Sequence, residues 1–282
     1  MVAAARVTLL GVAYDASSSH LRGPALAPRA IREALDSGAV NGWSEMGCDT
    51  RAPGVCGDAG DIAADASPEM RERVEAGVAA LLARETRPLV LGGDHSITYP
   101  VLRAMRSRHP RLAILHFDAH TDLYDEFEGD RHSHACPFAR IMEEGLTDRL
   151  VQVGIRTLNA HQREQAKRFR VEVHEMKDWD DARAFAFEQP VYVSVDLDVL
   201  DPAFAPGVSH REPGGCSVRQ LLRALQTVRA RIVGADVVEC NPAQDPVGLT
   251  PWVAAKVVGS SVLLLAVGQW IYTRGAREAR AR

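Results

Sequence analysis

Cysteine is scarce in this chain of 282 residues, and its spacing excludes two common uses of the residue. The five cysteines form an odd set without a Cys-x-x-Cys pair, which argues against a disulfide framework and against a structural zinc knuckle. We therefore expect a reducing compartment, the cytoplasm. Charge of one sign is also lacking: the formal net charge is -4 and acids and bases are mixed along the chain, so we expect no nucleic-acid partner.

Long hydrophobic runs are absent, with one partial exception. The N-terminus has neither the charged segment nor the small-residue cleavage site of a signal peptide, and residues 7–14 are predicted to form a first strand. Residues 257–272 are nearly all apolar, but they fall short of the ~20 residues of a membrane span and include Ser260, Ser261 and Gln269. We predict a buried terminal helix and no membrane partner. A membrane-anchored protein is the alternative.

The composition is that of a globular α/β protein. Hydrophobic residues make up 46% and charged residues 25%, enough for a sizeable core, and the length suits one domain over residues 1–282. Helix-like stretches at 68–84, 100–107 and 217–230 alternate with short runs rich in Val, Ile and Leu, which are 7–12, 88–91, 112–117, 150–153, 191–195 and 232–238. This alternation predicts a mainly parallel sheet with helices on both faces. Ligands of such sheets bind beyond the carboxyl ends of the strands.

One predicted strand, 112–117, leads directly into three potential metal ligands, Asp118, His120 and Asp122. Because side chains alternate along an extended chain, residues at i, i+2 and i+4 lie on one face and can converge on an ion. The ordinary alternative is a polar turn with an aspartate as a helix cap. We favour the metal interpretation, since all three residues follow a buried strand.

Two more strand ends carry residues of the same kind. Asp196 and Asp198 follow the run 191–195 and share a face, where two carboxylates repel each other and resist burial unless a cation neutralises them. His95 follows the glycine pair 92–93, which permits close backbone approach, and is expected to face the same crevice.

The combined donor set indicates which metal is bound. Four carboxylates and two imidazoles without a thiolate form a hard, oxygen-rich set that suits Mn²⁺ better than Zn²⁺ or Cu. So many anionic ligands predict two ions that share bridging carboxylates. Two ions ~3.5–4 Å apart lower the pKa of water toward neutrality. We therefore expect two Mn²⁺ ions per subunit and a hydrolytic reaction.

Three segments resemble the signature motifs of the ureohydrolase family, which includes arginases, agmatinases and formimidoylglutamases. They are 92–96 (GGDHS), 118–122 (DAHTD) and 194–202 (SVDLDVLDP), with lesser similarities at 23–32, 58–61, 154–156 and 239–242. The resemblance implies a three-layer α/β/α sandwich and a homo-oligomer, a trimer or hexamer. It also implies two ligand sets: His95, Asp118, Asp122 and Asp196 for one ion, and His120, Asp118, Asp196 and Asp198 for the other.

The resemblance further implies residue roles in cleaving a guanidino compound to urea and an amine. Glu239 matches the family's acidic residue that pairs with the guanidinium, and a carboxylate suits such a planar cation. His134 matches a loop histidine that shuttles protons, as its titration near neutrality allows. Asp122 is expected to orient the nucleophile as well as bind metal. His210 replaces a small hydroxyl residue of most members, and with Tyr124 it is expected to contact the substrate.

The loop between Asp122 and His134 indicates a substrate with a cationic tail. Its carboxylates would attract an ammonium group and repel an α-carboxylate: Asp125, Glu126, Glu128 and Asp130. The loop pattern also resembles agmatinases more than arginases, so the expected reaction is agmatine to putrescine, a step of polyamine biosynthesis. Arg131 and His132 keep open the alternatives of arginine and guanidinobutyrate.

Two further functions remain open. A catalytically silent relative would bind metal in a regulatory or interaction role, although all six ligands, Glu239 and His134 are present. A deacetylase of the same general fold would share only part of the ligand set and typically holds one zinc, so the metal count distinguishes it.

Overall fold

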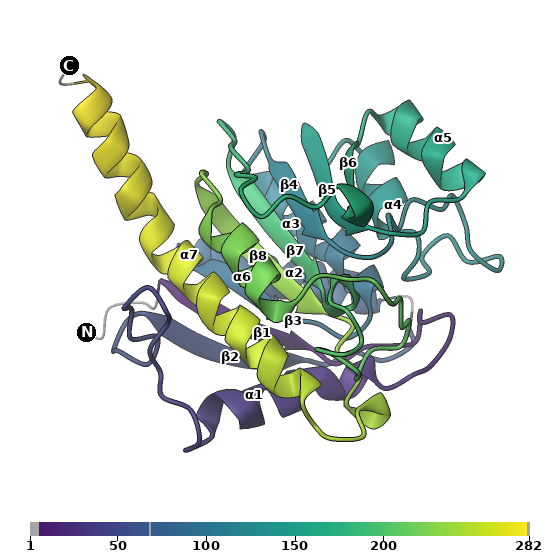
Figure 1. Cartoon of the computed structure of the whole chain (residues 1–282), viewed down its shortest axis with the longest axis horizontal. Coiled ribbons are helices and arrows are strands. Elements are labelled where there is room, and N and C mark those ends of the chain that lie inside the picture. The colour runs from purple at the N-terminus through teal and green to yellow at the C-terminus, as the bar shows by residue number, and fades with distance from the viewer. Residues whose placement is uncertain (1–5, 68, 281–282) are drawn as a thin grey trace.

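The computed structural model describes residues 6–67 and 69–280, except the side chains at 263 and 267–280. Within these residues the strands form one eight-stranded sheet in the order β2-β1-β3-β8-β7-β4-β5-β6, and every pairing is parallel (Figure 1). The strands are β1 Val7–Val12, β2 Cys56–Ile62, β3 Arg87–Leu91, β4 Ala113–Phe117, β5 Arg149–Ile155, β6 Glu172–Glu175, β7 Val191–Asp196 and β8 Ile232–Val238.

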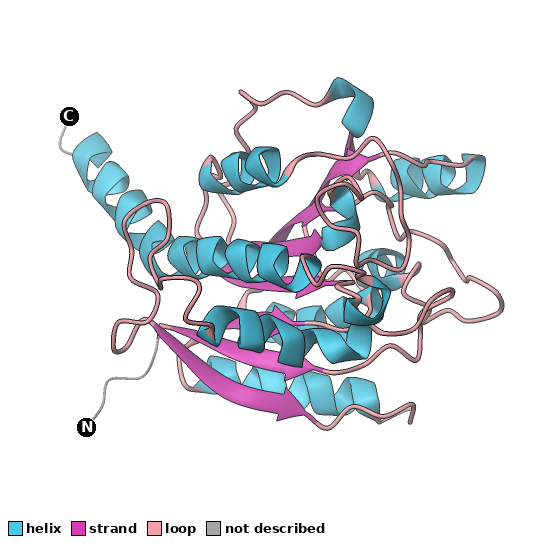
Figure 2. Ribbon diagram, turned by 60° about the horizontal axis from the view of Figure 1, so that its bottom comes forward, coloured by secondary structure: helices cyan, strands magenta, loops and turns pink. Residues whose placement is uncertain are grey.

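Helices cover both faces of this sheet, which confirms the predicted three-layer α/β/α architecture (Figure 2). They are α1 Ala27–Asp36, α2 Met70–Ala83, α3 Thr98–Arg108, α4 Pro137–Glu143, α5 Ala160–Phe169, α6 Val218–Gln226 and α7 Thr250–Arg280. One core cluster joins α1, α6 and α7 to the sheet, and the other joins α2, α3 and α4 to the opposite face. The central strands are therefore buried on both sides, as their continuous apolar runs require.

The six apolar runs are strands, as predicted, but two further strands lack the pattern that would reveal them. β2 has the polar sequence CGDAGDI and β6 is only EVHE, and both lie at the edges of the sheet. No residue of either strand is buried, so neither needs the apolar run of a strand that is covered on both faces.

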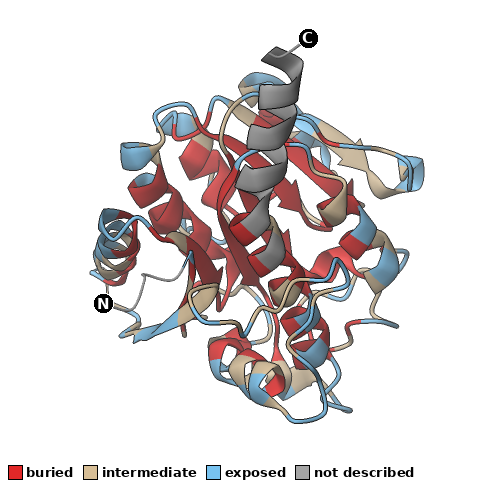
Figure 3. Cartoon of the chain, turned by 90° about the vertical axis from the view of Figure 1, so that its left-hand side faces the viewer, coloured by how far each residue is buried: buried red, intermediate tan, exposed pale blue. Residues whose placement is uncertain are grey.

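The terminal apolar segment packs in the core over the part whose side chains are described. α7 begins at Thr250, and it buries Val257, Val258, Val262 and Leu265 against the sheet (Figure 3). The rest of the predicted segment, 267–272, lies outside the described side chains. None of the helices in the described residues is long and apolar enough to cross a membrane.

Candidate metal centre

The six predicted metal ligands gather at the carboxyl ends of three central strands. His95 follows β3, Asp196 ends β7 and Asp198 follows it, and the triplet at 118–122 follows β4. In the sheet, β3, β8, β7 and β4 are consecutive neighbours. Glu239 follows the carboxyl end of β8. His120 is partly exposed, and the other five ligands are buried.

Two donor groups share Asp118. In the first, His95 Nδ1 lies 3.0 Å from Asp122 Oδ2 and 3.2 Å from both Asp118 Oδ2 and Asp196 Oδ2. In the second, His120 Nδ1 lies 2.9 Å from Asp198 Oδ2 and 3.5 Å from Asp118 Oδ1. The two oxygens of Asp118 therefore face different histidines, as expected of a carboxylate that bridges two ions.

The electrostatics of this cluster fit a bound cation. Burial and the charges of Asp198 and Asp118 raise the pKa of Asp196 well above its ordinary value, and burial and Asp118 raise the pKa of Asp198 to about 6. The buried Nδ1 of His95 forms no hydrogen bond with a described residue, although three carboxylate oxygens surround it. A metal ion would relieve the repulsion and use this free nitrogen.

Backbone conformation also sets this region apart. Asp122 and Glu239 have positive φ angles, 49° and 62°, which are strained for residues with a side chain and tend to occur at functional sites. Gly93 lies so close to the N-terminal loop that an added Cβ would be 1.7 Å from the carbonyl oxygen of Tyr14. The absence of a side chain at Gly93 thus lets that loop pass over the centre.

Glu239 and His134 form a hydrogen-bonded pair beside the metal ligands. The Nδ1 of His134 donates to Glu239 Oε1 at 2.8 Å, and the His95 backbone N–H donates to the same oxygen at 2.9 Å. Glu239 Oε2 is buried and has no partner among the described residues. The other ring nitrogen of His134 lies 2.8 Å from the Ser19 hydroxyl, a contact that the sequence did not predict.

A cavity of about 530 Å³ opens over the centre, and five predicted residues line it together: His120, Asp122, Tyr124, His134 and His210. The imidazole rings of His210 and His134 lie 5.1 Å apart between centroids. The size suits a small-molecule substrate.

The carboxylates of the loop after Asp122 are absent from the lining of this cavity. Its lining includes Tyr124 and Phe127 from that loop but not the four loop carboxylates, and Asp125 is instead bonded to Gln165 at 2.6 Å. Two arginines line the wall, Arg156 and Arg163. The loop carboxylates therefore lie outside the lining, and attraction of a cationic tail by them stays a prediction.

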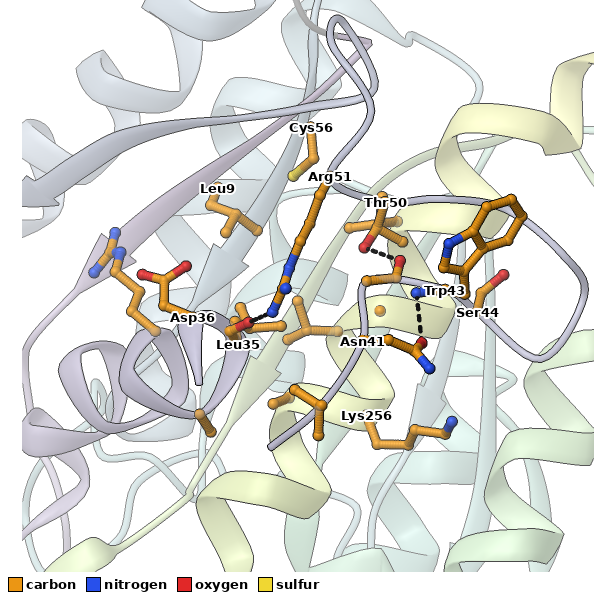
Figure 4. A pocket seen from close by; sticks show the side chains of 18 of the residues that line it. Leu9, Leu35, Asp36, Asn41, Trp43, Ser44, Thr50, Arg51, Cys56 and Lys256 are labelled. Carbon is orange, nitrogen blue, oxygen red and sulfur yellow. Dashed lines mark hydrogen bonds between the residues drawn. The ribbon is translucent and has the colours of Figure 1, made fainter. Parts of the chain in front are cut away.

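A second cavity, about 610 Å³, lies between α1, β2 and α7 and contains none of the predicted site residues. Figure 4 shows Trp43 and Lys256 at its side and the Arg51 guanidinium, which donates to the Leu35 carbonyl at the end of α1.

Residues within the sheet orient the predicted ligands, and the sequence analysis did not predict them. Ser194 Oγ lies 3.0 Å from His95 Nε2 and donates to Asp236 Oδ1 at 2.6 Å. Because Oγ gives its proton to Asp236, His95 Nε2 donates to it, which leaves His95 Nδ1 free for metal. A signal was present: Ser194 and His116 each precede a predicted ligand by two residues in an otherwise apolar strand, so each shares a face with that ligand.

The chain is similar in sequence and in structure to known proteins. The model of the arginase family matches residues 5–264. Arginase 1, mitochondrial, of Arabidopsis thaliana is 47% identical over 273 residues, 91% of this chain and 80% of the relative. The structure of the arginase from Medicago truncatula matches with a TM-score of 0.89 at 44% identity. The match covers 93% of this chain and 88% of the Medicago chain. A hypothetical agmatinase from Burkholderia thailandensis has a TM-score of 0.83 at 30% identity, with coverages of 95% and 88%.

Proposed function

Because this chain belongs to the arginase family, we propose that it hydrolyses arginine to ornithine and urea. The observation that carries the proposal is the 47% identity to an Arabidopsis arginase over 91% of the chain. The hypothetical agmatinase from Burkholderia thailandensis is 30% identical to this chain. These comparisons favour the arginine alternative over agmatine, the substrate expected from the loop pattern.

The cavity supports a substrate that carries a carboxylate. Asn159 Nδ2 donates to the Tyr124 hydroxyl oxygen at 2.6 Å, so the proton of that hydroxyl is free to donate to another acceptor. Arg163 lines the same wall; its guanidinium is paired with Glu175 at 3.5 Å and has further N–H donors. The α-carboxylate of arginine fits these donors, whereas the tail of agmatine has only an ammonium group.

The metal centre suits two Mn²⁺ ions, held by the two donor groups that share Asp118. When bound, the ions would lower the pKa of water and so supply a nucleophile at neutral pH. Asp122, whose Oδ2 lies 3.0 Å from His95 Nδ1, would orient that water. The assignment of manganese follows from the family and from the oxygen-rich donor set.

Glu239 and His134 would act on the substrate. The unpartnered Oε2 of Glu239 would accept from the guanidinium and hold its carbon near the nucleophile. Burial alone would lower the pKa of His134, but the charge of Glu239 and their hydrogen bond raise it to about 9. This raised pKa favours a proton on His134 at neutral pH for the departing amine, and Nε2, which accepts from the Ser19 backbone N–H at 3.1 Å, would leave that contact to carry it. His210, across the cavity, would contact the substrate chain.

The test is urea release from arginine, agmatine and guanidinobutyrate with Mn²⁺ present. The proposal expects the highest kcat/KM for arginine. A higher value for agmatine would support the reaction of agmatine to putrescine and leave the metal chemistry intact. Release of no urea from any of the three would favour a silent relative.

Assembly and location remain predictions from the sequence. Light scattering coupled to size-exclusion chromatography will measure whether the chain forms the expected trimer or hexamer. The cytoplasmic expectation contrasts with the word mitochondrial in the name of the Arabidopsis relative, and imaging of the tagged protein in its own cells will test it.

A further inference from the structure

A row of four buried polar side chains crosses the sheet beneath the metal centre. Asp236 on β8, Ser194 on β7, His116 on β4 and Gln152 on β5 are register partners on successive strands, and each is fully buried. Polar groups in the interior of a parallel sheet cost free energy unless they are paired. The proposed function uses neither His116 nor Gln152.

His116 joins the row to the shared ligand Asp118. Its Nε2 lies 2.8 Å from Asp118 Oδ2, and its Nδ1 lies 3.0 Å from Gln152 Nε2. The His116 ring stacks on Phe138 with 4.0 Å between the centroids and 25° between the planes. Packing therefore holds the ring plane, and the two nitrogens have one partner each.

The position of the imidazole proton follows from the carbonyl of Thr121. Gln152 Nε2 lies 2.7 Å from that carbonyl oxygen, which can only accept, so the Gln152 atom facing it must be the NH₂ group. The second N–H of this group donates to His116 Nδ1, which therefore carries no proton. His116 is then protonated at Nε2 and donates to Asp118.

We propose that His116 is a positioning residue for Asp118, and that Gln152 holds His116 in the required tautomer. The proposal rests on the metal centre of the proposed function. Asp118 Oδ2 accepts from His116, and Asp118 Oδ1 accepts from the His120 backbone N–H at 2.6 Å. Both oxygens of the shared ligand are thus oriented before a metal binds, one toward each histidine of the centre. Because its Nε2 carries the proton, His116 supports a ligand and is not one itself.

The first test is manganese affinity, measured by calorimetric titration of the metal-free protein. His116→Leu removes the donor and should weaken Mn²⁺ binding about 10- to 100-fold, as loss of a partner to a metal ligand typically does. His116→Gln places an amide N–H near the Nε2 position and should restore most of the affinity. Thr147→Val is the matched control, since it removes one buried hydroxyl bonded to the Leu112 carbonyl at 2.9 Å and leaves the four-residue row and the proposed ligands untouched.

The outcomes separate positioning from a purely structural role. Wild-type affinity in His116→Leu would overturn the proposal, and so would equal losses in His116→Leu and His116→Gln. If the leucine variant does not fold, His116→Asn takes its place, because its shorter amide reaches the Nδ1 position and not Asp118.

A second measurement does not depend on metal or substrate. Nitrogen NMR of the His116 ring in the metal-free protein should show the proton on Nε2, and Gln152→Leu should give a mixture of tautomers. A proton on Nδ1 in the wild type would overturn the proposal. Failure of the wild type to bind Mn²⁺ would instead contradict the proposed function, and the ring measurement would still decide the tautomer.

Discussion

Replacement of Glu239 by glutamine isolates the interaction proposed to hold the guanidinium. The side chain keeps its size, and its Oε1 can still accept from His134 and from the His95 backbone. The buried Oε2, however, becomes an NH₂ group that faces the donors of the substrate. A hydrogen bond to a charged group contributes about 1.5–3 kcal/mol, so kcat/KM for arginine should fall about 10- to 150-fold.

The assay is steady-state urea release at saturating Mn²⁺, together with the metal content of the variant. Glu239 is not a proposed ligand, so we expect the glutamine variant to keep the manganese of the wild type. A kcat/KM within about twofold of wild type would refute the role of Glu239. Loss of metal along with activity would show that Glu239 supports the centre instead of the substrate.

Three other substitutions test separate parts of the account. His134→Ala should lower kcat about 10²- to 10⁴-fold with little change in KM. In the wild type, kcat should decline as the pH rises through about 9, where His134 loses its proton; a flat profile there would assign the proton transfer elsewhere. Asp196→Ala should remove activity and much of the manganese by elemental analysis, and full metal content would contradict its role as a ligand. Gly93→Ala should lower the Tm by several degrees, since overpacking costs roughly 1–3 kcal/mol. Gly38→Ala is its control, because its added Cβ would meet no atom within 4 Å; equal Tm values would contradict the close approach.

The sequence predicted the central part of the fold because buried parallel strands have continuous apolar runs. The edge strands β2 and β6 lack such runs, and partial exposure is the reason. The clustering of the proposed ligands was predictable for a related reason. Asp118, His120 and Asp122 alternate along extended chain directly after a strand, and parallel strands bring their carboxyl ends together.

Contacts between distant segments were not predictable from local patterns. Ser19 meets His134 across 115 positions of sequence, and only the folded loop brings them together. The same limitation applies to the loop after Asp122. Its carboxylates are close in sequence to the centre, but Asp125 is turned toward Gln165 on α5. Sequence proximity therefore did not indicate which residues line the cavity.

Titration of Mn²⁺ into the metal-free protein, with urea release from arginine followed at each addition, tests the central claim most directly. The account predicts that urea release rises with added metal and reaches its maximum at two ions per chain. A maximum at one ion, full activity without added metal, or no urea at any ratio would contradict a two-manganese arginine hydrolase.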